Sequence, residues 1–216
     1  MKLMNSLGPN PRIVRMFAAE KGIDLDFEEV DLLAGENRQA AYLVKNPSGQ
    51  LPALVLDDGT CLSEITAICE YLEDTQASPP LVGTTPEEKA ETRMWTRKLD
   101  LGIAEPMANG FRYAEGLEIF KNRLHVIPQA ADDLKATAQE GLEKLDGWMD
   151  GKQFICGDRF TMADVHLFGM LDFFASVGQP IDTAQKNVAA WYERVGARPS
   201  AEKSLHPAAM AVGMRG

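Results

Sequence analysis

The sequence predicts a small α/β domain followed by an all-helical domain, and three observations support this prediction. The first 75 residues alternate between short strand-like and helical segments. Residues 76–85 (QASPPLVGTT) contain a Pro-Pro pair and small polar residues, which is typical of a linker. From Pro86 onward every periodic segment has helical spacing. We therefore expect one domain at residues 1–75, a linker at 76–85 and a second domain at 86–216.

The N-terminal segments predict a parallel pair of strands joined by a helix. Residues 2–5 are predicted to form the first strand, and residues 26–31 (DFEEVD) the second. Between them a helix is expected from Pro11, with Asn10 as its N-cap and Gly22 as its stop. The order strand, helix, strand requires a crossover connection, which favours a parallel arrangement.

Residues 46–72 predict a β-hairpin that leads into an amphipathic helix, preceded by a weak helical stretch at 38–44. Pro52 opens the first strand of this hairpin, where it cannot donate a ladder hydrogen bond. A cis peptide at Pro52 would turn the chain sharply and leave the backbone of Leu51 unpaired at a sheet edge. An ordinary loop proline is the alternative interpretation.

The helical half contains several well-marked helices. Pro86 and the acidic residues behind it are typical of a helix start, and residues 126–149 form a long amphipathic pattern. Thr161 with Asp164 three residues later predicts a capped helix. The segment after it is apolar almost all round, so we expect a buried central helix. A last helix is predicted at 186–195, and the tail to residue 216 shows little pattern.

Composition excludes several classes of function. Twenty-two Lys and Arg against 32 Asp and Glu give a net charge of −10, which argues against a nucleic-acid partner or an anionic membrane surface. The N-terminal residues lack the features of a secretory signal and no run reaches transmembrane length, so a cytoplasmic location is expected. The three cysteines form no CxxC pair and the three histidines lack metal-ligand spacing. We therefore expect no disulfide framework and no metal site.

Several short motifs, in this order, resemble the cytosolic glutathione S-transferase family over essentially the whole chain. They are GQLPAL at 49–54, SEITAICEYLE at 63–73, the Pro-rich linker, and GDRFTMADVHL at 157–167. The resemblance implies a thioredoxin-like N-terminal domain that binds glutathione and an all-α C-terminal domain that forms most of the electrophile pocket. It also implies a homodimer, with glutathione as co-substrate and a role in detoxification.

The same resemblance implies a glutathione site along the hairpin. The matching proline of the family is cis, and the residue before it, here Leu51, pairs its backbone with the cysteinyl part of glutathione. Gln50 would lie beside the same ligand. Glu64 and the start of the following helix would bind the γ-glutamyl end, since free N–H groups favour an anion.

At one position the chain departs from the family pattern. A Ser or Thr usually follows the acid, whereas here Ile65 follows Glu64. The backbone N–H remains, but the hydroxyl is lost, and Ser63 would replace it only if the turn were rearranged. For the glycine carboxylate of glutathione, the resemblance points to Asn37, Arg38 and Lys45, for which solvated surface positions are the alternative.

The residue that would activate the thiol is less clearly marked. The family's tyrosine is absent, with Met4 in its place, and so is the family's cysteine. Because only the thiolate attacks electrophiles well, a donor near the sulfur is expected at the end of the first strand or in the turn into the first helix. Ser6 and Asn10 are the candidates, with Asn5 also in reach. In the alternative, Asn10 is a plain N-cap and Ser6 a turn residue.

Three functions follow from these features. The first is conjugation of the glutathione thiolate to small apolar electrophiles, in a pocket that includes Trp95, Met107, Phe111 and Tyr113. The second is glutathione-dependent reduction of disulfides or peroxides, without a protein cysteine as nucleophile. The third is a non-catalytic binding or regulatory module with the same fold. The identity of the electrophile is not encoded in any motif.

Overall fold

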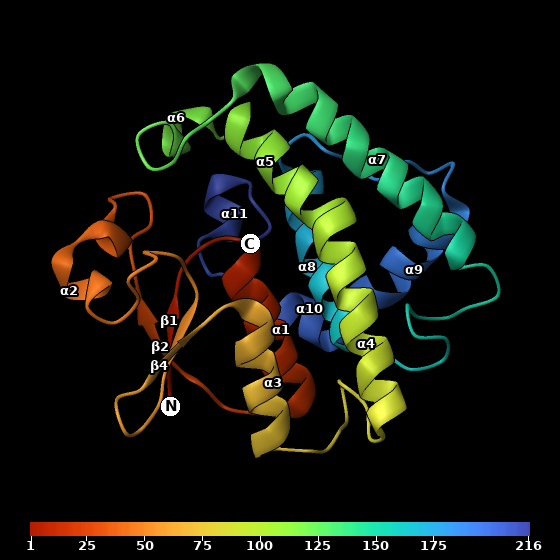
Figure 1. Ribbon diagram of the computed structural model, residues 1–216, viewed down its shortest axis with the longest axis horizontal. Coiled ribbons are helices and arrows are strands. Elements are labelled where there is room, and N and C mark those ends of the chain that lie inside the picture. The colour runs from red at the N-terminus through yellow and green to blue at the C-terminus, as the bar shows by residue number, and fades with distance from the viewer. The chain divides into compact units, whose positions relative to one another are not determined.

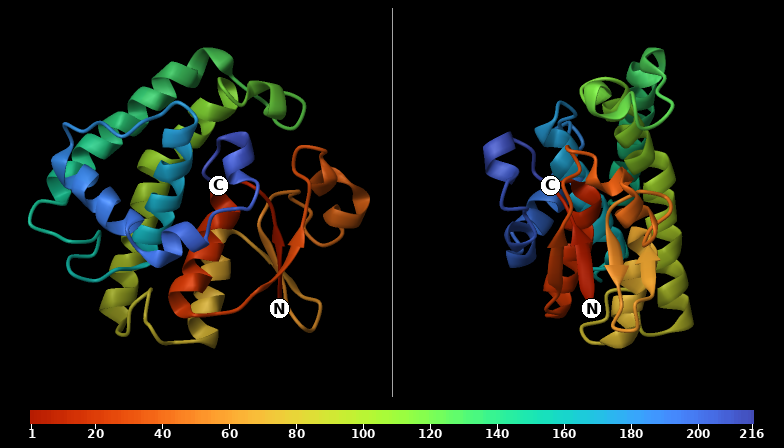
Figure 2. Two further views of the ribbon diagram at one scale, coloured as in Figure 1. Left: turned by 180° about the vertical axis from the view of Figure 1, so that it is seen from behind. Right: turned by 90° about the vertical axis from the view of Figure 1, so that its left-hand side faces the viewer.

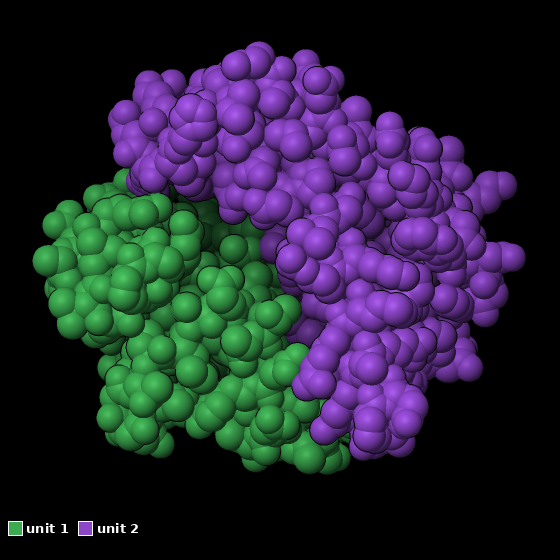
Figure 3. All heavy atoms as spheres, in the orientation of Figure 1, with its two compact units in different colours: residues 1–81, 199–216 green, residues 82–198 purple.

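The computed structural model describes all 216 residues, which form two compact units (Figure 3). Unit 1 contains residues 1–81 together with 199–216, and unit 2 contains residues 82–198. Residues 199–216, which the sequence pattern assigns to the helical domain, therefore pack with the α/β domain instead. Side chains of the first helix hold this tail in place, as described below.

A four-stranded mixed sheet forms the centre of unit 1 (Figures 1 and 2). The strands are β1 (Lys2–Asn5), β2 (Asp26–Glu29), β3 (Ala53–Val55) and β4 (Cys61–Ser63), in the order β2-β1-β3-β4. β1 and β2 are parallel, whereas β3 is antiparallel to both of its neighbours. The predicted parallel pair and hairpin are confirmed, although β2 is shorter than expected.

Helices α1 (Pro9–Lys21) and α3 (Ile65–Thr75) pack side by side in unit 1 (Figure 1). The short helices are α2 (Ala40–Leu43), preceded by a 3₁₀ turn at Glu36–Arg38, and α10 (Pro199–Lys203) and α11 (Ala209–Val212) in the tail. α10 packs on α1. Because the tail has no long periodic run, the sequence pattern did not reveal these last two helices.

The predicted start of α1 is wrong by two residues. Gly8 is the N-cap, with φ 139°, and Pro9 takes the first helical position. Asn10 therefore lies inside the first turn, and its side chain makes no capping hydrogen bond. Either Pro9 or Pro11 suits a helix start by its fixed φ, and glycine readily adopts the positive φ found at position 8. The structure thus removes the plain N-cap explanation for Asn10.

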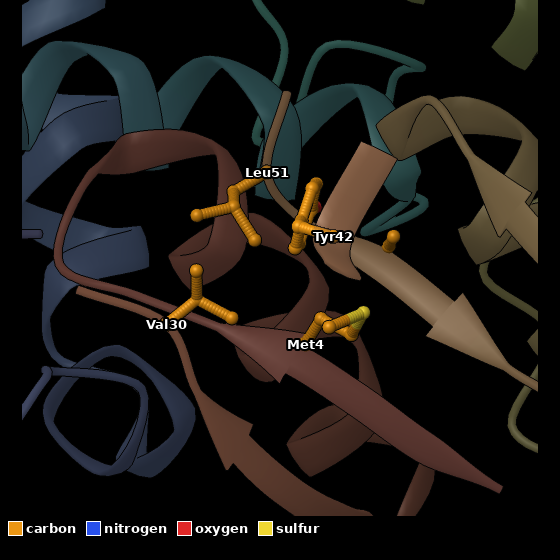
Figure 4. Packing of buried hydrophobic residues seen from close by; sticks show 5 residues of the cluster. Met4, Val30, Tyr42 and Leu51 are labelled. Atoms are coloured by element: carbon orange, nitrogen blue, oxygen red, sulfur yellow. The ribbon is translucent and has the colours of Figure 1, made fainter. Parts of the chain in front are cut away.

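A hydrophobic cluster lies on the opposite side of the sheet from α1. Met4, Val30, Tyr42, Leu51 and Ala53 pack together there (Figure 4). Their positions follow from strand alternation, since Met4 and its partner Ala53 point to the same face. Met4, which stands where the family often has an aromatic residue, is a core side chain that supports Leu51.

Unit 2 is entirely helical apart from short bridges in the loop at 154–159. α4 (Pro86–Leu99) continues through a π-helical turn (Asp100–Ala104) into α5 (Glu105–Tyr113). The other elements are α6 (Leu117–Phe120), a 3₁₀ turn (Pro128–Ala130), α7 (Ala131–Trp148), α8 (Met162–Ser176) and α9 (Lys186–Gly196). α8 packs against α4, α5 and α9, and its first 13 residues are buried. The predicted central helix is confirmed.

Asp164 holds the start of α8 to two other parts of unit 2. Its carboxylate accepts hydrogen bonds from the N–H groups of Thr161 (2.8 Å) and Ile155 (2.9 Å) and from the indole N–H of Trp191 (2.8 Å). Burial raises the pKa of Asp164 to about 6, so the group is ionised at neutral pH. The Thr161 hydroxyl donates to the same carboxylate at 3.1 Å, so one carboxylate satisfies four buried donors.

We expect Asp164→Ala to lower the free energy of unfolding by about 3 kcal/mol, because four buried donors lose a charged acceptor. Thr161→Ala removes one hydroxyl and leaves the other three donors of Asp164 in place, so a loss of about 1 kcal/mol is expected. Urea denaturation of the two variants and the parent measures both values. Equal losses would show that Asp164 acts as a helix cap alone.

Candidate functional site

Leu51 presents its backbone while its side chain is anchored in the core. The peptide bond between Leu51 and Pro52 is cis, as the family resemblance implies. The Leu51 side chain packs in the cluster of Figure 4, but its N–H and C=O make no hydrogen bond within the chain. Two unpaired groups beside β3 are suited to pair with an extended, peptide-like ligand.

Side chains from the preceding segment fix the chain that leads to Leu51. The carbonyl of Gln50 accepts hydrogen bonds from the Tyr42 hydroxyl and from Asn46 Nδ2 (2.9 Å). Burial raises the pKa of Tyr42 to about 12, so its phenol remains a donor at neutral pH. The carbonyl of Gly49 accepts a further bond of 2.6 Å from Asn37 Nδ2. Two successive carbonyls before Leu51 are therefore held in place.

Gly49 is required in this loop on steric grounds. Its φ is +64°, and a Cβ atom there would lie 3.0 Å from Arg38 Nη1 and 3.1 Å from the Asn37 carbonyl oxygen. A side chain would therefore need both an unfavourable backbone conformation and displacement of its neighbours. The glycine allows the loop to approach Asn37 and Arg38 closely.

Glu64 marks the second part of the site, at the start of α3. It is the one non-glycine residue with a positive φ, 72°, a conformation that costs on the order of 1 kcal/mol or more. Its carboxylate is exposed and forms no cap, which leaves the first amides of α3 available. Strained residues of this kind are enriched at ligand sites, and a helix start with open N–H groups binds anions.

The residues around Glu64 supply two hydroxyls. Ser63 ends β4 opposite Ala53, and Thr66 is exposed in the first turn of α3. Neither hydroxyl makes a hydrogen bond within the chain. Sequence reasoning considered Ser63 but missed Thr66, which lies one residue after Ile65. The sequence feature that could have identified Thr66 is a hydroxyl residue in the first turn of a predicted helix.

The turn between β1 and α1 holds the two candidates for thiol activation. Ser6 is buried, Asn10 is half-buried, and neither side chain makes a hydrogen bond within the chain. Pro9 and Pro11 have no N–H, and the N–H of Arg12 is bonded to the Gly8 carbonyl at 3.3 Å. The first turn of α1 therefore offers few backbone donors to an anion. A side-chain donor is correspondingly more important.

Asn5, the third residue in reach, has no free amide group. Its Nδ2 donates to Glu29 Oε1, and its Oδ1 accepts from Arg15 Nη1. Arg15 Nη1 also donates to the Ser6 carbonyl at 3.2 Å. The structure thus leaves Ser6 and Asn10 as the candidates with uncommitted side chains.

The three residues expected at the glycine end of glutathione differ in their surroundings. Asn37 is 1% exposed, and its amide nitrogen is already bonded to the Gly49 carbonyl within the loop. Lys45 forms an ion pair with Glu28 at 3.0 Å, and this hydrogen bond lowers the pKa of Glu28. Arg38 is half-buried, forms no ion pair, and places Nη1 beside Gly49. Arg38 is therefore the candidate among the three with an uncommitted charge.

The structure does not bring the four predicted pocket residues together. Trp95 packs against Trp148, whereas Phe111 packs against Phe120, Phe173 and Phe174. Along the continuous run from α4 to α5, Trp95 and Phe111 are roughly 24 Å apart. Met107 is fully buried, so Tyr113 is the one of the four with substantial exposure. A single small pocket lined by all four is therefore not supported.

The C-terminal tail contacts the β1–α1 turn, which sequence reasoning missed. Arg12 donates to the carbonyls of Arg215 (2.7 Å) and Ala201 (3.1 Å) and to the Ser204 hydroxyl (3.3 Å). Gly216 lies so close to Gly8 that an added Cβ would come within 2.6 Å of the Gly8 nitrogen. The available signal was a pair of arginines, Arg12 and Arg15, within an otherwise apolar helix.

Unit 1 is a thioredoxin-like domain with an unpaired strand edge at a cis proline and an open helix start. Unit 2 is an all-helical domain. The family description of the glutathione S-transferase N-terminal domain matches residues 8–75, and that of the C-terminal domain matches residues 114–199. The chain belongs to the glutathione S-transferase family and is a transferase enzyme.

Individual relatives agree with this assignment. Glutathione S-transferase 2 of Saccharomyces cerevisiae is 34% identical over 205 residues, covering 92% of this chain and 86% of the relative. The crystal structure of Gtt2 from the same organism matches with a TM-score of 0.87 and 32% identity, over 95% of this chain and 100% of the other. A maleylacetoacetate isomerase of Pseudomonas aeruginosa is 31% identical over 90% of each chain. In the structure, no helix has the length and apolar character needed to span a membrane.

We expect Tyr42→Phe to weaken glutathione binding by about fivefold, because the Gln50 carbonyl loses a donor worth about 1 kcal/mol and the Leu51 edge loosens. Calorimetric titration with glutathione measures the change. Tyr71→Phe is the matched control, since the Tyr71 hydroxyl makes no hydrogen bond within the chain. Equal affinities of the two variants would show that the loop is held by other contacts.

Proposed function

We propose that this enzyme conjugates the thiolate of glutathione to small apolar electrophiles, with glutathione bound along unit 1. The observation that carries the proposal is that the Leu51 backbone, which is free of hydrogen bonds, and the open start of α3 lie at the same end of the hairpin. β3 and β4 are antiparallel with Ala53 opposite Ser63, so continuing this register places Pro52 opposite Glu64. The strand edge and the helix start therefore lie at the same end of the hairpin.

Each part of this surface suits one part of the tripeptide. The N–H and C=O of Leu51 would pair with the cysteinyl residue as a neighbouring strand would. The first N–H groups of α3 would donate hydrogen bonds to the γ-glutamyl carboxylate, while the exposed Glu64 carboxylate would pair with the γ-glutamyl ammonium. Arg38 would attract the glycine carboxylate at the other end, with Asn37, Gln50 and Lys45 shaping the loop between them.

The chemistry would depend on ionising the bound thiol near neutral pH. A hydroxyl or amide N–H that donates to the sulfur stabilises the thiolate and lowers the pKa of the thiol. Ser6 and Asn10 are the side chains in the β1–α1 turn that can make this bond. Ser6 is our first choice because its hydroxyl is uncommitted and sits directly after β1.

The chain's own cysteines do not offer a competing nucleophile in this turn. Cys69 and Cys156 are buried, Cys61 is half-buried, and burial raises the pKa of all three thiols. Reduction of a disulfide or peroxide by this protein would therefore also use the bound glutathione thiolate. This reductase activity is the second candidate, and a glutathione-binding module without turnover is the third.

A panel of substrates separates these candidates. Conjugation predicts turnover of aryl halides and enones, and reductase activity predicts turnover of small disulfides or hydroperoxides instead. Glutathione binding with neither activity and with no thiolate absorbance at neutral pH would favour the module. We also propose a cytoplasmic homodimer, and sedimentation equilibrium tests the oligomeric state.

We expect Ser6→Ala to raise the pKa of bound glutathione by about one unit, which corresponds to a tenfold smaller thiolate fraction at a fixed pH below it. The affinity for glutathione should change little, because the hydroxyl acts on the ionised thiol. The pH dependence of kcat/KM measures the shift, and Asn10→Ala serves as the parallel variant. An unshifted profile in Ser6→Ala with a shifted one in Asn10→Ala would transfer the role to Asn10.

We expect Glu64→Ala to weaken glutathione binding by about tenfold, because an exposed carboxylate and a preset backbone turn at α3 are both lost. Asp74→Ala is the control, since Asp74 is an exposed carboxylate at the other end of the same helix. Calorimetric titration of both variants measures the dissociation constants. Similar values for Glu64→Ala and the parent would place the γ-glutamyl end elsewhere.

A further inference from the structure

Arg15 connects the end of β1 and the turn after it to the C-terminal tail of unit 1. It lies on α1 with 8% of its surface exposed. Its Nη1 donates to Asn5 Oδ1 and to the Ser6 carbonyl, and its Nε donates to the Ser204 carbonyl at 2.8 Å. One guanidinium therefore joins the end of β1, the following turn and the C-terminal tail.

Asn5 extends this connection to the surface. Its Nδ2 donates to Glu29 on β2, and Glu29 in turn is 2.9 Å from Nε2 of His206 in the tail. Although burial acts in the opposite direction, the hydrogen bonds from His206 and Asn5 lower the pKa of Glu29. Glu29 is therefore an ionised anchor for the Asn5 amide at neutral pH. The chain of contacts encloses Ser6 between a fixed strand end and a fixed tail.

The guanidinium also places a positive charge behind the turn. Burial, followed by the nearby charge of Arg12, lowers the pKa of Arg15 to about 10, which leaves Arg15 protonated at neutral pH. A buried charge is weakly screened, so its field reaches an anion bound near Ser6. With prolines at two positions of the first turn, α1 itself supplies few N–H donors for this purpose.

We propose that Arg15 is a positioning residue for thiol activation. Its hydrogen bonds to Asn5 and to the Ser6 carbonyl fix the turn that contains Ser6. The proposal rests on glutathione being the bound ligand. Arg15 does not touch the sulfur in this arrangement. Its guanidinium holds Ser6, the residue proposed to donate to the sulfur. Its positive charge favours the thiolate over the thiol.

Arg15→Gln and Arg15→Lys separate the contribution of the positive charge from that of the guanidinium hydrogen bonds. The readout is the pKa of bound glutathione, taken from the ultraviolet absorbance of the thiolate as a function of pH. Arg15→Gln should raise this pKa by about one unit, a tenfold loss of thiolate at a fixed pH below it. Arg15→Lys keeps the charge without the planar fork, so it should recover part of the shift. An unchanged thiol pKa in a folded Arg15→Gln variant would overturn the proposal.

Glu29 provides a second test that does not alter the buried arginine. Removing its carboxylate takes a negative charge away from the site, which by itself lowers the thiol pKa. Glu29→Gln retains an oxygen that can accept from Asn5, whereas Glu29→Ala retains none. If Asn5 must be held, the thiol pKa should be about half a unit higher in Glu29→Ala than in Glu29→Gln. Equal values in the two variants would overturn the positioning role of this chain of contacts.

Two controls separate this proposal from the proposed function. Asp26→Ala removes an exposed carboxylate from the same strand and should leave the thiol pKa unchanged. A parent protein that does not bind glutathione would refute the proposed function and this proposal together. A parent that binds glutathione, combined with an unshifted thiol pKa in Arg15→Gln and equal thiol pKa values in Glu29→Ala and Glu29→Gln, would refute the positioning role alone.

Discussion

The register between β3 and β4 is the constraint on which the candidate site depends. Ala53 is paired with Ser63, and a slip by one residue would move every side chain of the hairpin to the other face of the sheet. The core cluster beneath Leu51 opposes such a slip, because Ala53 shares it with Met4 and Val30. The same pairing that buries these side chains sets the unpaired backbone of Leu51 beside the open start of α3.

The loop before Leu51 shows how binding geometry is obtained from buried polar groups. Tyr42, Asn46 and Asn37 point inward and donate to the carbonyls of Gly49 and Gln50. A carbonyl left without a partner in this setting would be costly, so these contacts define one loop conformation. Leu51 can then offer its N–H and C=O in a fixed direction, which reduces the entropy lost when a ligand binds.

Local patterns predicted the hairpin, the capped helix at Thr161 and the buried helix after it, since each depends on residues close in the sequence. The family resemblance, rather than the local pattern, implied the cis bond at Pro52. The contacts of Arg15 could not be predicted in this way, because its partner Ser204 is 189 residues away. For the same reason the tail was assigned to the wrong unit. Trp95 and Phe111 were both expected in the pocket because they lie in the first helical segments after the linker, and the length of the continuous helical run separates them.

The two helix starts of unit 1 have opposite characters, so under the proposed function the two ends of the site would use different chemistry. α3 begins without a capping side chain and without proline in its first turn, so its amides are available to a carboxylate. α1 begins with Pro9 and Pro11, so its dipole remains but most of its donors are missing. A thiolate beside α1 must therefore be stabilised by side chains. In the proposed mechanism, the buried arginines and the free hydroxyl of Ser6 would supply the charge and the hydrogen bond that the helix backbone lacks.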